Sequence, residues 1–495
     1  MITLRPYQER ALQGVRDAYA AGYRAPLLVA PTGGGKTIMF SDVAQRASAK
    51  QVSSLILAHR RELIKQASQK LTASDVPHGI VAPGFTPTRE LVRVGSVQTV
   101  ALRLDRPEHQ SYGLNVIDEA HHAIAGLWER IIKANPRARL LGTTATPERQ
   151  DGRGLGIEAG GVFDCLVMGP TIGELIADGY LVQSRVFAPT VEADFSRVRT
   201  KNGDYNTDDL AAVMDQPGIT GDAVAHYARL ADGLPAIAFC ANRKHGQGVA
   251  DTFRAAGYRA VFVDGTMPVS IRDAGINGLA TGQVQVLCVA DLISEGVDIP
   301  AVSCLISLRR TQSLGLWMQQ IGRGLRPVFA PGFDLNTQHG RLEAIAASQK
   351  PALIVLDHSG NTLRHGLPDT EREWSLNGRP KREREGVQVK QCPTCYAIHA
   401  PLPACPQCGH SYVVDKPKTG SLALVASDGE LQEVDEAARD RIEALRKGKL
   451  HDILTGNETL EELREIGKAR NYSPQWPWME FQRAKARRQK AKVAA

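Results

Sequence analysis

The stretch LLVAPTGGGKT, residues 27–37, places a glycine-rich turn directly after a short apolar run. In such a turn, glycines let backbone N–H groups converge on an anion, and the lysine and threonine that follow supply positive charge and a ligand for Mg²⁺. Ala30 stands where the complete phosphate-loop pattern has its first glycine. The stretch therefore predicts a strand, a loop that binds nucleotide phosphates and a helix. A turn that is merely flexible is the simpler alternative.

Apolar runs recur along the chain in two series of five, separated by stretches with a helical pattern. Runs that are apolar on both faces are typical of parallel strands joined by crossover helices. The first series lies at 26–30, 54–58, 93–97, 114–118 and 139–144, and the second at 236–240, 260–264, 284–290, 302–308 and 352–357. Two such series predict two α/β domains in tandem, each a doubly wound parallel sheet.

The length of 495 residues exceeds one domain, for which about 100–200 residues are usual. We expect the first α/β domain at 1–180, the second at 181–365, a polar linker at 366–390, a cysteine-rich module at 391–413 and a helical segment at 428–495. The polar start and the lack of an apolar run of about 18 residues predict a cytoplasmic protein with no membrane partner.

The end of the sequence is strongly basic. Six Lys and Arg side chains within residues 483–492 account for all but one of the net charges of +7. Such a composition is typical both of a solvated segment and of a nucleic-acid contact, so it does not decide the function. For Trp476 and Trp478, which precede the basic run, we favour the core of a small helical pack, with stacking on bases as the alternative.

Asp118 and Glu119 stand at the end of another apolar run. In an open parallel sheet, residues just after the strands line the ligand site. An aspartate there can hold Mg²⁺, and an adjacent glutamate can orient or deprotonate an attacking water. Together with the glycine-rich loop, the pair predicts an ATP site. Gln8, in LRPYQ, adds an amide able to pair with an adenine edge.

An ordered set of motifs now identifies a resemblance. LRPYQ, APTGGGKT, LAHRRELIKQ, GSVQT, VIDEAHHA and GTTATPER resemble the Q-motif and motifs I, Ia, Ib, II and III of superfamily 2 helicases. AIAFCANRKHG, VDGTM, VLCVADLISEGVDIP and QQIGRGLRP resemble motifs IV to VI. LRPYQ, GSVQT, ADGYL, QQIGRGLRP and LDHSGN, followed by a cysteine cluster, look most like bacterial RadD-type DNA-repair ATPases and related phage helicases. The sequence DEAH argues against the strict DEAD-box RNA branch.

The resemblance implies two RecA-like domains that bind ATP and Mg²⁺ between them. It assigns nucleotide contacts to Arg5, Gln8, Thr32, Gly33, Gly34, Gly35, Lys36, Thr37, Asp118, Gly296 and Asp298. It assigns catalysis to Glu119, Gln319, Arg323 and Arg326, whose arginines would reach the transferring phosphoryl group from the second domain.

The resemblance also implies contacts to a polynucleotide, made without reading its bases. These contacts are expected at His59, Arg60, Ser96, Gln98, Asn242, Thr266 and Ser294. Coupling between the ATP site and the polynucleotide is expected at His121, Thr144 and Thr146.

Two C-x-x-C pairs, Cys392/Cys395 and Cys405/Cys408, stand nine residues apart. Four thiolates at this spacing predict a closed, structural Zn²⁺ site, with an iron–sulfur centre or a degenerate site as alternatives. His399 or His410 is an alternative fourth ligand. The remaining cysteines stand singly, mostly in apolar runs, where cysteine behaves as a small hydrophobic residue.

The leading hypothesis is an ATP-dependent DNA helicase or translocase that acts in replication, recombination or repair. Its expected partners are single-stranded or branched DNA, together with single-strand-binding or recombination proteins. The alternatives are the motor subunit of a restriction system, an RNA helicase, or a nucleotide-regulated DNA clamp that does not unwind.

Overall fold

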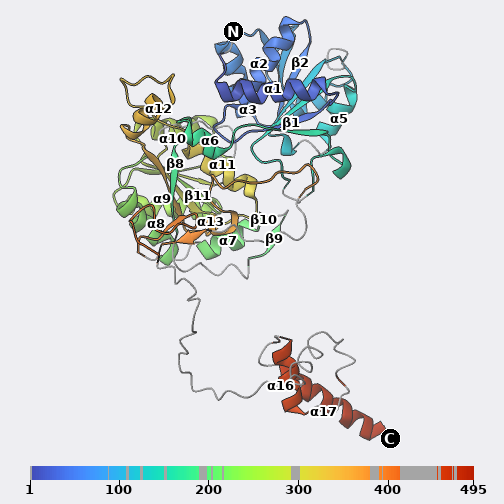
Figure 1. Ribbon diagram of the computed structural model, residues 1–495, viewed down its shortest axis with the longest axis vertical. Helices are drawn as coiled ribbons and strands as arrows, with labels where there is room; N and C mark the ends of the chain where they lie inside the picture. Colours follow the sequence, from blue (N-terminus) through green and yellow to red (C-terminus); the bar gives the residue numbers. More distant parts are fainter. Residues whose placement is uncertain are drawn as a thin grey trace, which may run out of the picture. The chain divides into compact units, whose positions relative to one another are not determined.

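The chain divides into two compact units, Met1–Val414 and Asp415–Ala495 (Figure 1). The structure is a computed structural model. It describes residues 3–86, 88–106, 111–122, 126–149, 153–188, 198–201, 204–214, 217–290, 302–378, 389–392, 394–412, 454, 459–470, 472 and 476–494.

The first sheet has its strands in the order β3-β4-β2-β5-β6-β1-β7, and every pair is parallel. They are β1 (Pro26–Val29), β2 (Ser54–Ala58), β3 (His78–Val81), β4 (Val92–Ser96), β5 (Leu114–Asp118), β6 (Arg139–Thr144) and β7 (Cys165–Met168). The helices of this domain are α1 (Pro6–Ala20), α2 (Lys36–Ala49), α3 (Arg61–Ala73), α4 (Val97–Ala101), α5 (Leu127–Ala134) and the 3-10 turns η2 (Ala120–His122) and η3 (Ile157–Ala159). Leu28 and Ile56 enter one core while Leu27 and Leu55 enter another, so both faces of the sheet are covered.

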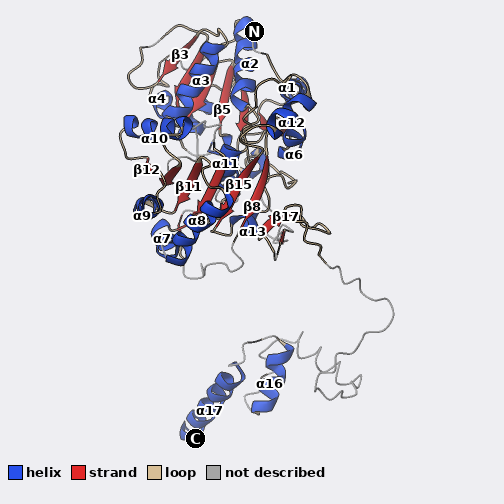
Figure 2. Cartoon of the chain, turned by 90° about the vertical axis from the view of Figure 1, so that its left-hand side faces the viewer, coloured by secondary structure: helices blue, strands red, loops and turns tan. Residues whose placement is uncertain are grey.

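The second sheet has the order β12-β13-β11-β14-β15-β8-β17-β16. Its strands are β8 (Gln183–Phe187), β11 (Ala236–Cys240), β12 (Ala260–Asp264), β13 (Val286–Ala290), β14 (Cys304–Leu308), β15 (Ala352–Asp357), β16 (Lys390–Gln391) and β17 (Ala397–His399). Figure 2 shows helices beside these strands, and Ile237 and Ala238 enter separate cores on the two faces. The helices are α6 (Ile172–Ala177), α7 (Thr207–Met214), α8 (Pro217–Leu230), α9 (Arg243–Ala255), α10 (Val269–Thr281), α11 (Leu314–Gly324), α12 (Gln338–Ala346) and α13 (Asn361–His365), with a hairpin of β9 (Thr200–Lys201) and β10 (Asp204–Tyr205).

The predicted fold class is confirmed, because each of the ten apolar runs overlaps a strand of one of the two sheets, and these ten strands pair only in parallel with one another. The sequence analysis missed β3, β7 and β8. The first two are the edges of the first sheet, and all three contain partly exposed residues. A strand that buries fewer side chains carries a weaker apolar signal, which explains the omission.

Residues 366–378, part of the expected linker, contact both α/β domains. Trp374 packs against the core of the second sheet. Leu376 packs against a core of the first sheet, and its carbonyl accepts hydrogen bonds from the N–H groups of Leu155 at 2.8 Å and Gly156 at 2.9 Å. This segment therefore connects the second domain back to the first.

The unit Asp415–Ala495 contains α16 (Leu460–Ala469) and α17 (Trp476–Ala494), which pack on each other. Leu463 and Ile466 of α16 are buried. The expectation that the tryptophans form a core is wrong for Trp478, which is 60% exposed. No helix in the described part of the chain has both the length and the apolar character needed to cross a membrane.

Candidate nucleotide site and cysteine cluster

The glycine-rich loop joins β1 to α2 in the predicted way. Gly33 and Gly35 have φ values of 89° and 79°, a left-handed backbone that favours glycine. Lys36 begins α2 and is 9% exposed, and its Nζ donates to the Ala30 carbonyl at 3.3 Å. Thr32 Oγ1 is buried with no hydrogen-bond partner among the described residues. These features fit a loop whose remaining polar groups are completed by the phosphates of a nucleotide.

Gln8 and Arg5 lie beside this loop. An added Cβ at Gly35 would lie 2.3 Å from Gln8 Nε2, so the amide is in contact with the loop. Gln8 Oε1 accepts from the Arg5 N–H at 2.9 Å and thereby caps α1. The Arg5 guanidinium carbon lies 4.6 Å from the ring centroid of Tyr180. Adenine recognition by Gln8 stays a prediction, and one of its two amide atoms already has a partner.

The acidic pair follows β5, one strand beyond β6 from the loop. Asp118 Oδ1 accepts from Thr143 Oγ1 and from the Glu119 N–H, both at 3.0 Å. Burial, together with the nearby charge of Glu119, raises the pKa of Asp118 to about 6, although Lys36 and the hydrogen bonds to the carboxylate oppose the change. Glu119 has a φ of 48°, which is costly for a residue other than glycine. Thr143 lies in the stretch GTTATPER, but the sequence analysis gave a role only to Thr144 and Thr146 of that stretch.

His121 connects the acidic pair to the strand beside it. Its Nδ1 lies 3.5 Å from Glu119 Oε2 and 3.2 Å from Thr144 Oγ1. Thr144 Oγ1 in turn donates to the Thr146 carbonyl at 2.9 Å. The three residues expected to couple the ATP site to the polynucleotide thus form one chain of contacts that starts at Glu119.

Helix α11 of the second domain packs on the glycine-rich loop. An added Cβ at Gly322 would lie 2.4 Å from Thr32 Cβ, so helix and loop meet without an intervening side chain. An added Cβ at Gly33 would lie 3.8 Å from Arg326 Cγ. The structure therefore brings residues about 290 positions apart into one site.

The second domain contributes buried cations to this site. Gln319 and Arg323 on α11 are 4% and 8% exposed, and burial lowers the pKa of Arg326. Lys350 is also buried, and burial together with Arg326 lowers its pKa to about 7. The sequence analysis missed Lys350, because it lies outside every motif.

The residues expected to touch a polynucleotide in the first domain gather on neighbouring strands. His59 and Arg60 follow β2, and Ser96 and Gln98 follow β4, which pairs with β2. Ser96 Oγ donates to Gln98 Oε1 at 2.8 Å. They stand at the same edge of the sheet as the predicted nucleotide residues, which lie at the ends of β1 and β5.

In the second domain, the expected polynucleotide contacts already have internal partners. Asn242 caps α9 by accepting from the His245 N–H at 2.9 Å, and its Nδ2 donates to Asp208 Oδ1 at 3.0 Å. Thr266 Oγ1 donates to Asp264 Oδ1 at 2.7 Å. Three further predicted residues, Ser294, Gly296 and Asp298, lie outside the described residues.

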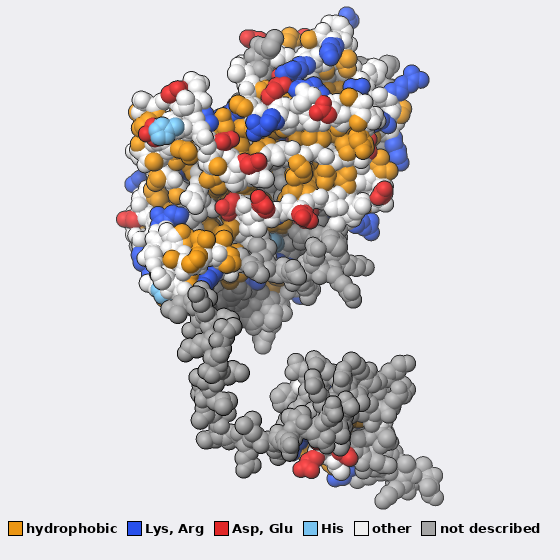
Figure 3. All heavy atoms as spheres, viewed as in Figure 1, with side chains coloured by type: hydrophobic (Ala, Val, Ile, Leu, Met, Phe, Trp, Pro, Cys, Tyr) orange, Lys and Arg blue, Asp and Glu red, His pale blue; other side chains and the backbone are white. Residues whose placement is uncertain are grey.

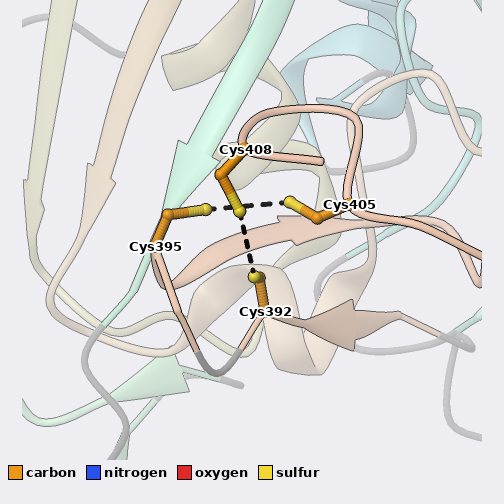
Figure 4. Close-up of side chains that lie close together, drawn as sticks. All are labelled: Cys392, Cys395, Cys405 and Cys408. Atoms are coloured by element: carbon orange, nitrogen blue, oxygen red, sulfur yellow. Dashed lines mark hydrogen bonds between the residues drawn. The ribbon is translucent and has the colours of Figure 1, made fainter. Parts of the chain in front are cut away.

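The four clustered cysteines converge on one point (Figure 4). Cys392 Sγ lies 3.6 Å from Cys408 Sγ, Cys395 Sγ lies 3.7 Å from Cys405 Sγ, and all four sulfurs lie within 4.8 Å of one another. A tetrahedral site with Zn–S bonds of about 2.3 Å needs sulfurs about 3.8 Å apart, whereas a disulfide needs about 2.05 Å. The spacing fits four ligands around one ion.

Neither nearby histidine completes the cluster. His399 Nδ1 and Nε2 lie 2.6 Å from the Ala400 carbonyl and from the Tyr412 hydroxyl, and His410 Nδ1 lies 3.0 Å from Thr394 Oγ1. The geometry therefore favours the set of four cysteines over a set with histidine.

The thiols of the cluster share protons unequally. Burial opposes ionisation of Cys392, but N–H groups of Cys395 and Thr394 and the neighbouring thiols lower its pKa to about 5. Burial, with the neighbouring thiols, raises the pKa of Cys395 to about 12. The Cys392 thiolate is stabilised by hydrogen bonds from the neighbouring protonated thiols. In a metal site, a bound cation stabilises the thiolates instead.

The cysteine module extends the second sheet. β17 pairs antiparallel with β8, and Gln391 Nε2 donates to the Ala188 carbonyl at 2.7 Å. Cys392 and Cys405 belong to the same core as strands β11 and β14. The module is therefore part of the second domain rather than a separate body.

Comparison with known proteins identifies the family. A family model described as "Type III restriction enzyme, res subunit" matches residues 1–149, and one described as "Helicase conserved C-terminal domain" matches residues 222–328. Over 445 residues the chain is 31% identical to a 51.5 kDa protein of a Lactococcus phage (isolate 7-9), with 88% of each chain covered. The chain belongs to helicase superfamily 2. As a member of that superfamily it is a nucleic-acid-dependent ATPase.

Two further relatives are named as helicases. This superfamily 2 chain is 30% identical to "Putative ATP-dependent helicase IRC3" of Saccharomyces cerevisiae, covering 65% of this chain and 49% of the yeast protein. It is 26% identical to "Putative DNA 3'-5' helicase Rad25" of Halobacterium salinarum, covering 66% of this chain and 52% of that protein. The chain spans about half the length of these two relatives.

A solved structure shares the fold. A fragment of a type I restriction enzyme HsdR subunit from Vibrio vulnificus YJ016 matches with a TM-score of 0.55 and 20% identity, over 76% of this chain and 67% of that fragment. The match supports the arrangement of two RecA-like domains.

Replacing Asp118 by Asn is expected to stop turnover and to stabilise the nucleotide-free protein. Because the native pKa of Asp118 lies above its unfolded value, the native state loses stability as the pH rises through about 6. Asparagine cannot ionise, so it avoids this loss and raises the free energy of unfolding by ~3 kcal/mol at most. Unfolding temperatures without nucleotide should therefore favour Asp118→Asn at pH 8 and converge with those of the wild type near pH 4. If Asp118→Asn were less stable than the wild type at pH 8, the inference that the ionised, buried Asp118 carboxylate destabilises the native state would be wrong.

Arg323→Ala and Arg326→Ala are expected to lower kcat by about three powers of ten or more, because cations of this kind stabilise charge on the transferring phosphoryl group. ATP affinity should change far less. Steady-state turnover and ATP binding are the measurements, with Arg254→Ala as a control, since that guanidinium bonds to Asp251 and the Ala260 carbonyl. Parallel losses in affinity and kcat would indicate an ordinary ground-state contact.

Proposed function

We propose that this chain is an ATP-driven DNA translocase or helicase that moves on or remodels single-stranded or branched DNA. The observation that supports the proposal is the packing of α11 on the glycine-rich loop, since the arginines Arg323 and Arg326 of one domain would then face the phosphates of a nucleotide bound to the other. A nucleotide bound there would touch both domains. Binding and release of ATP would then change how tightly the domains close.

Each residue of the site has a chemical task in this proposal. The backbone of residues 30–35 and Lys36 would hold the phosphates. Thr37 and Asp118 would hold Mg²⁺, which neutralises charge on the phosphate oxygens. Glu119 would orient the attacking water, and its strained backbone and contact with His121 fit a residue held in a fixed orientation. Arg323 and Arg326 would complete the site on closure.

DNA is the proposed polynucleotide. The first support is the similarity to a protein named as a DNA helicase and to a model of a restriction enzyme subunit. The second is the position of His59 and Ser96 at the ends of adjacent strands, at the edge where the ATP residues are proposed. Acidic and basic side chains mix on the face drawn in Figure 3, so a narrow row of polar loop residues is a better candidate for the DNA track than a broad basic surface on that face.

The biological role proposed for this activity is DNA repair. It rests on the resemblance of LRPYQ, QQIGRGLRP and LDHSGN, with the cysteine cluster, to RadD-type ATPases. Single-strand-binding or recombination proteins are the partners that such a role requires.

We further propose that Cys392, Cys395, Cys405 and Cys408 bind one Zn²⁺. The fit of the sulfur spacing to a tetrahedral site supports this assignment. Four protein ligands leave no open position, so the ion would be structural and would hold β17 against β8.

A second candidate is the motor subunit of a restriction system. The family model over residues 1–149 favours it. This candidate predicts that the chain forms a stable complex with a separate nuclease or methylase subunit. Purification of the native protein from its host, with the associated proteins identified by mass spectrometry, separates it from an independently acting translocase.

Cys405→Ser is expected to lose the single bound zinc, because three thiolates and a hydroxyl bind the ion far more weakly. The unfolding temperature should fall as well, since the module is continuous with the second sheet through β8. Metal content per chain is the measurement. Cys165→Ser, outside the cluster, serves as the control and should retain one zinc. Unchanged zinc in Cys405→Ser would place the ligands elsewhere.

ATP turnover by the wild type is expected to be low alone and to rise about tenfold or more with DNA, because bound DNA would hold the two domains in the closed arrangement. Turnover should be measured with single-stranded DNA, forked duplex and RNA. Lys36→Ala should abolish turnover in every arm and serves as the control for contaminating ATPases. Maximal turnover without nucleic acid would refute a motor, and equal stimulation by RNA would favour an RNA helicase. DNA-stimulated turnover without movement on DNA would indicate a clamp.

A further inference from the structure

Asn361, the last residue of the stretch LDHSGN and one with no role assigned from the sequence, is completely buried at the start of α13. Its Nδ2 donates to the Arg309 carbonyl at 2.8 Å, and Ser359 Oγ and Ser307 Oγ lie within 3.0 and 3.2 Å as further acceptors. Its Oδ1 accepts from the Thr311 N–H at 2.9 Å. The amide thus holds a carbonyl and an N–H of the same short loop, residues 309–313.

The backbone of Asn361 is itself held by a buried carboxylate. Asp357, at the end of β15, is completely buried. It accepts from the Asn361 N–H at 3.2 Å, from the Thr362 N–H at 2.6 Å and from Ser359 Oγ at 3.0 Å. These charge-assisted bonds leave Asn361 little freedom to follow the loop if the loop moves.

The loop that Asn361 holds determines where α11 begins. Thr311 Oγ1 donates to Asp204 Oδ2 at 2.7 Å and accepts from the Ser313 N–H at 3.0 Å. Ser313 then caps α11 by accepting from the Leu316 N–H at 3.1 Å. The first turn of α11 is therefore built on the segment that the Asn361 amide bonds.

Both ends of α11 meet the first domain. Near its start, an added Cβ at Gly315 would lie 2.9 Å from Thr146 Oγ1, at the end of the contact chain from Glu119. Near its end, Gly322 meets Thr32 in the glycine-rich loop. A hydrogen-bonded helix behaves as a stiff rod at this length, so a shift at its start is carried to Arg323 near its end.

We propose that Asn361 is a positioning residue for ATP hydrolysis. It sets the start of α11 against Thr146 and thereby places Arg323 and Arg326 at the phosphate site. The proposal rests on the proposed function, in which the nucleotide binds between the two domains. Asparagine suits the task because one planar group accepts from an N–H and donates to a carbonyl, which neither a carboxylate nor a hydroxyl can do with the same geometry.

The test compares Asn361→Ala with a matched control, Asn135→Ala. Asn135 is also a buried asparagine, and its Oδ1 accepts from the Tyr112 N–H at 3.1 Å at the start of β5, away from the glycine-rich loop. In both variants kcat is measured at saturating ATP with single-stranded DNA, ATP affinity with a fluorescent ATP analogue, and unfolding temperature by calorimetry.

Asn361→Ala is expected to lower kcat about tenfold or more while ATP affinity changes less than about threefold, since the loss falls on groups that act in the transition state. Asn135→Ala should lower the unfolding temperature and leave kcat within about twofold of the wild type below that temperature. A kcat for Asn361→Ala that matches the control would overturn the proposal. A parallel loss of ATP affinity would also overturn it, because it would indicate general damage to the site.

Gly315→Ala keeps the proposal testable if Asn361→Ala does not fold. The added methyl group would press on Thr146 Oγ1 and leave the Asn361 network intact. A fall in kcat at unchanged ATP affinity would support the claim that the position of α11 sets the rate of hydrolysis. A kcat equal to that of the wild type would refute this claim. If wild-type turnover does not respond to DNA, the proposed function fails, but the same comparison of kcat with affinity is made on turnover without DNA. The two failures are therefore distinguishable.

Discussion

The close packing of α11 on the glycine-rich loop fixes how the second α/β domain meets the first. At Gly322 the helix approaches Thr32 so closely that a single added carbon would lie 2.4 Å from the threonine Cβ. A contact of this kind tolerates little displacement, because packed atoms cannot interpenetrate and a gap loses their attraction. In the proposed function, Arg323 and Arg326 would reach a nucleotide on the other domain only while this contact holds.

The site collects buried charges at a cost to stability. Burial raises the pKa of Asp118 to about 6 and lowers that of Lys350 to about 7, so each group is held in an environment that disfavours its charged form. The proposed ligand, with its negative phosphates and Mg²⁺, would supply the missing counter-charges. Such a ligand stabilises the folded chain by mass action, and the strain at Glu119 is consistent with a site organised for chemistry rather than for stability.

Two further sets of contacts, away from the candidate nucleotide site, stabilise the second domain and its junction with the first. The cysteine module, too small for a core of its own, shares one with β11 and β14 and covers β8, which would otherwise be an exposed edge. Residues 366–378 cross back to the first domain, where the Leu376 carbonyl accepts two N–H groups. Gly154 leaves room for that carbonyl, since an added Cβ would lie 2.1 Å from it. The domains are thus joined by more than the chain between β7 and β8.

The sequence was enough to predict the two series of strands, the glycine-rich turn, the acidic pair and the four clustered cysteines, because each depends on chemistry within a few neighbouring residues. Apolar runs buried on both faces, glycines with left-handed backbone and C-x-x-C turns are local patterns. Three further features are visible only in the folded chain: Lys350 lies near Arg326, Leu376 returns to the first domain and Asn361 holds the loop before α11. These side chains act through partners that lie tens to hundreds of residues away. Their spacing along the chain carries no signal, since packing and hydrogen bonding between distant segments alone bring them together.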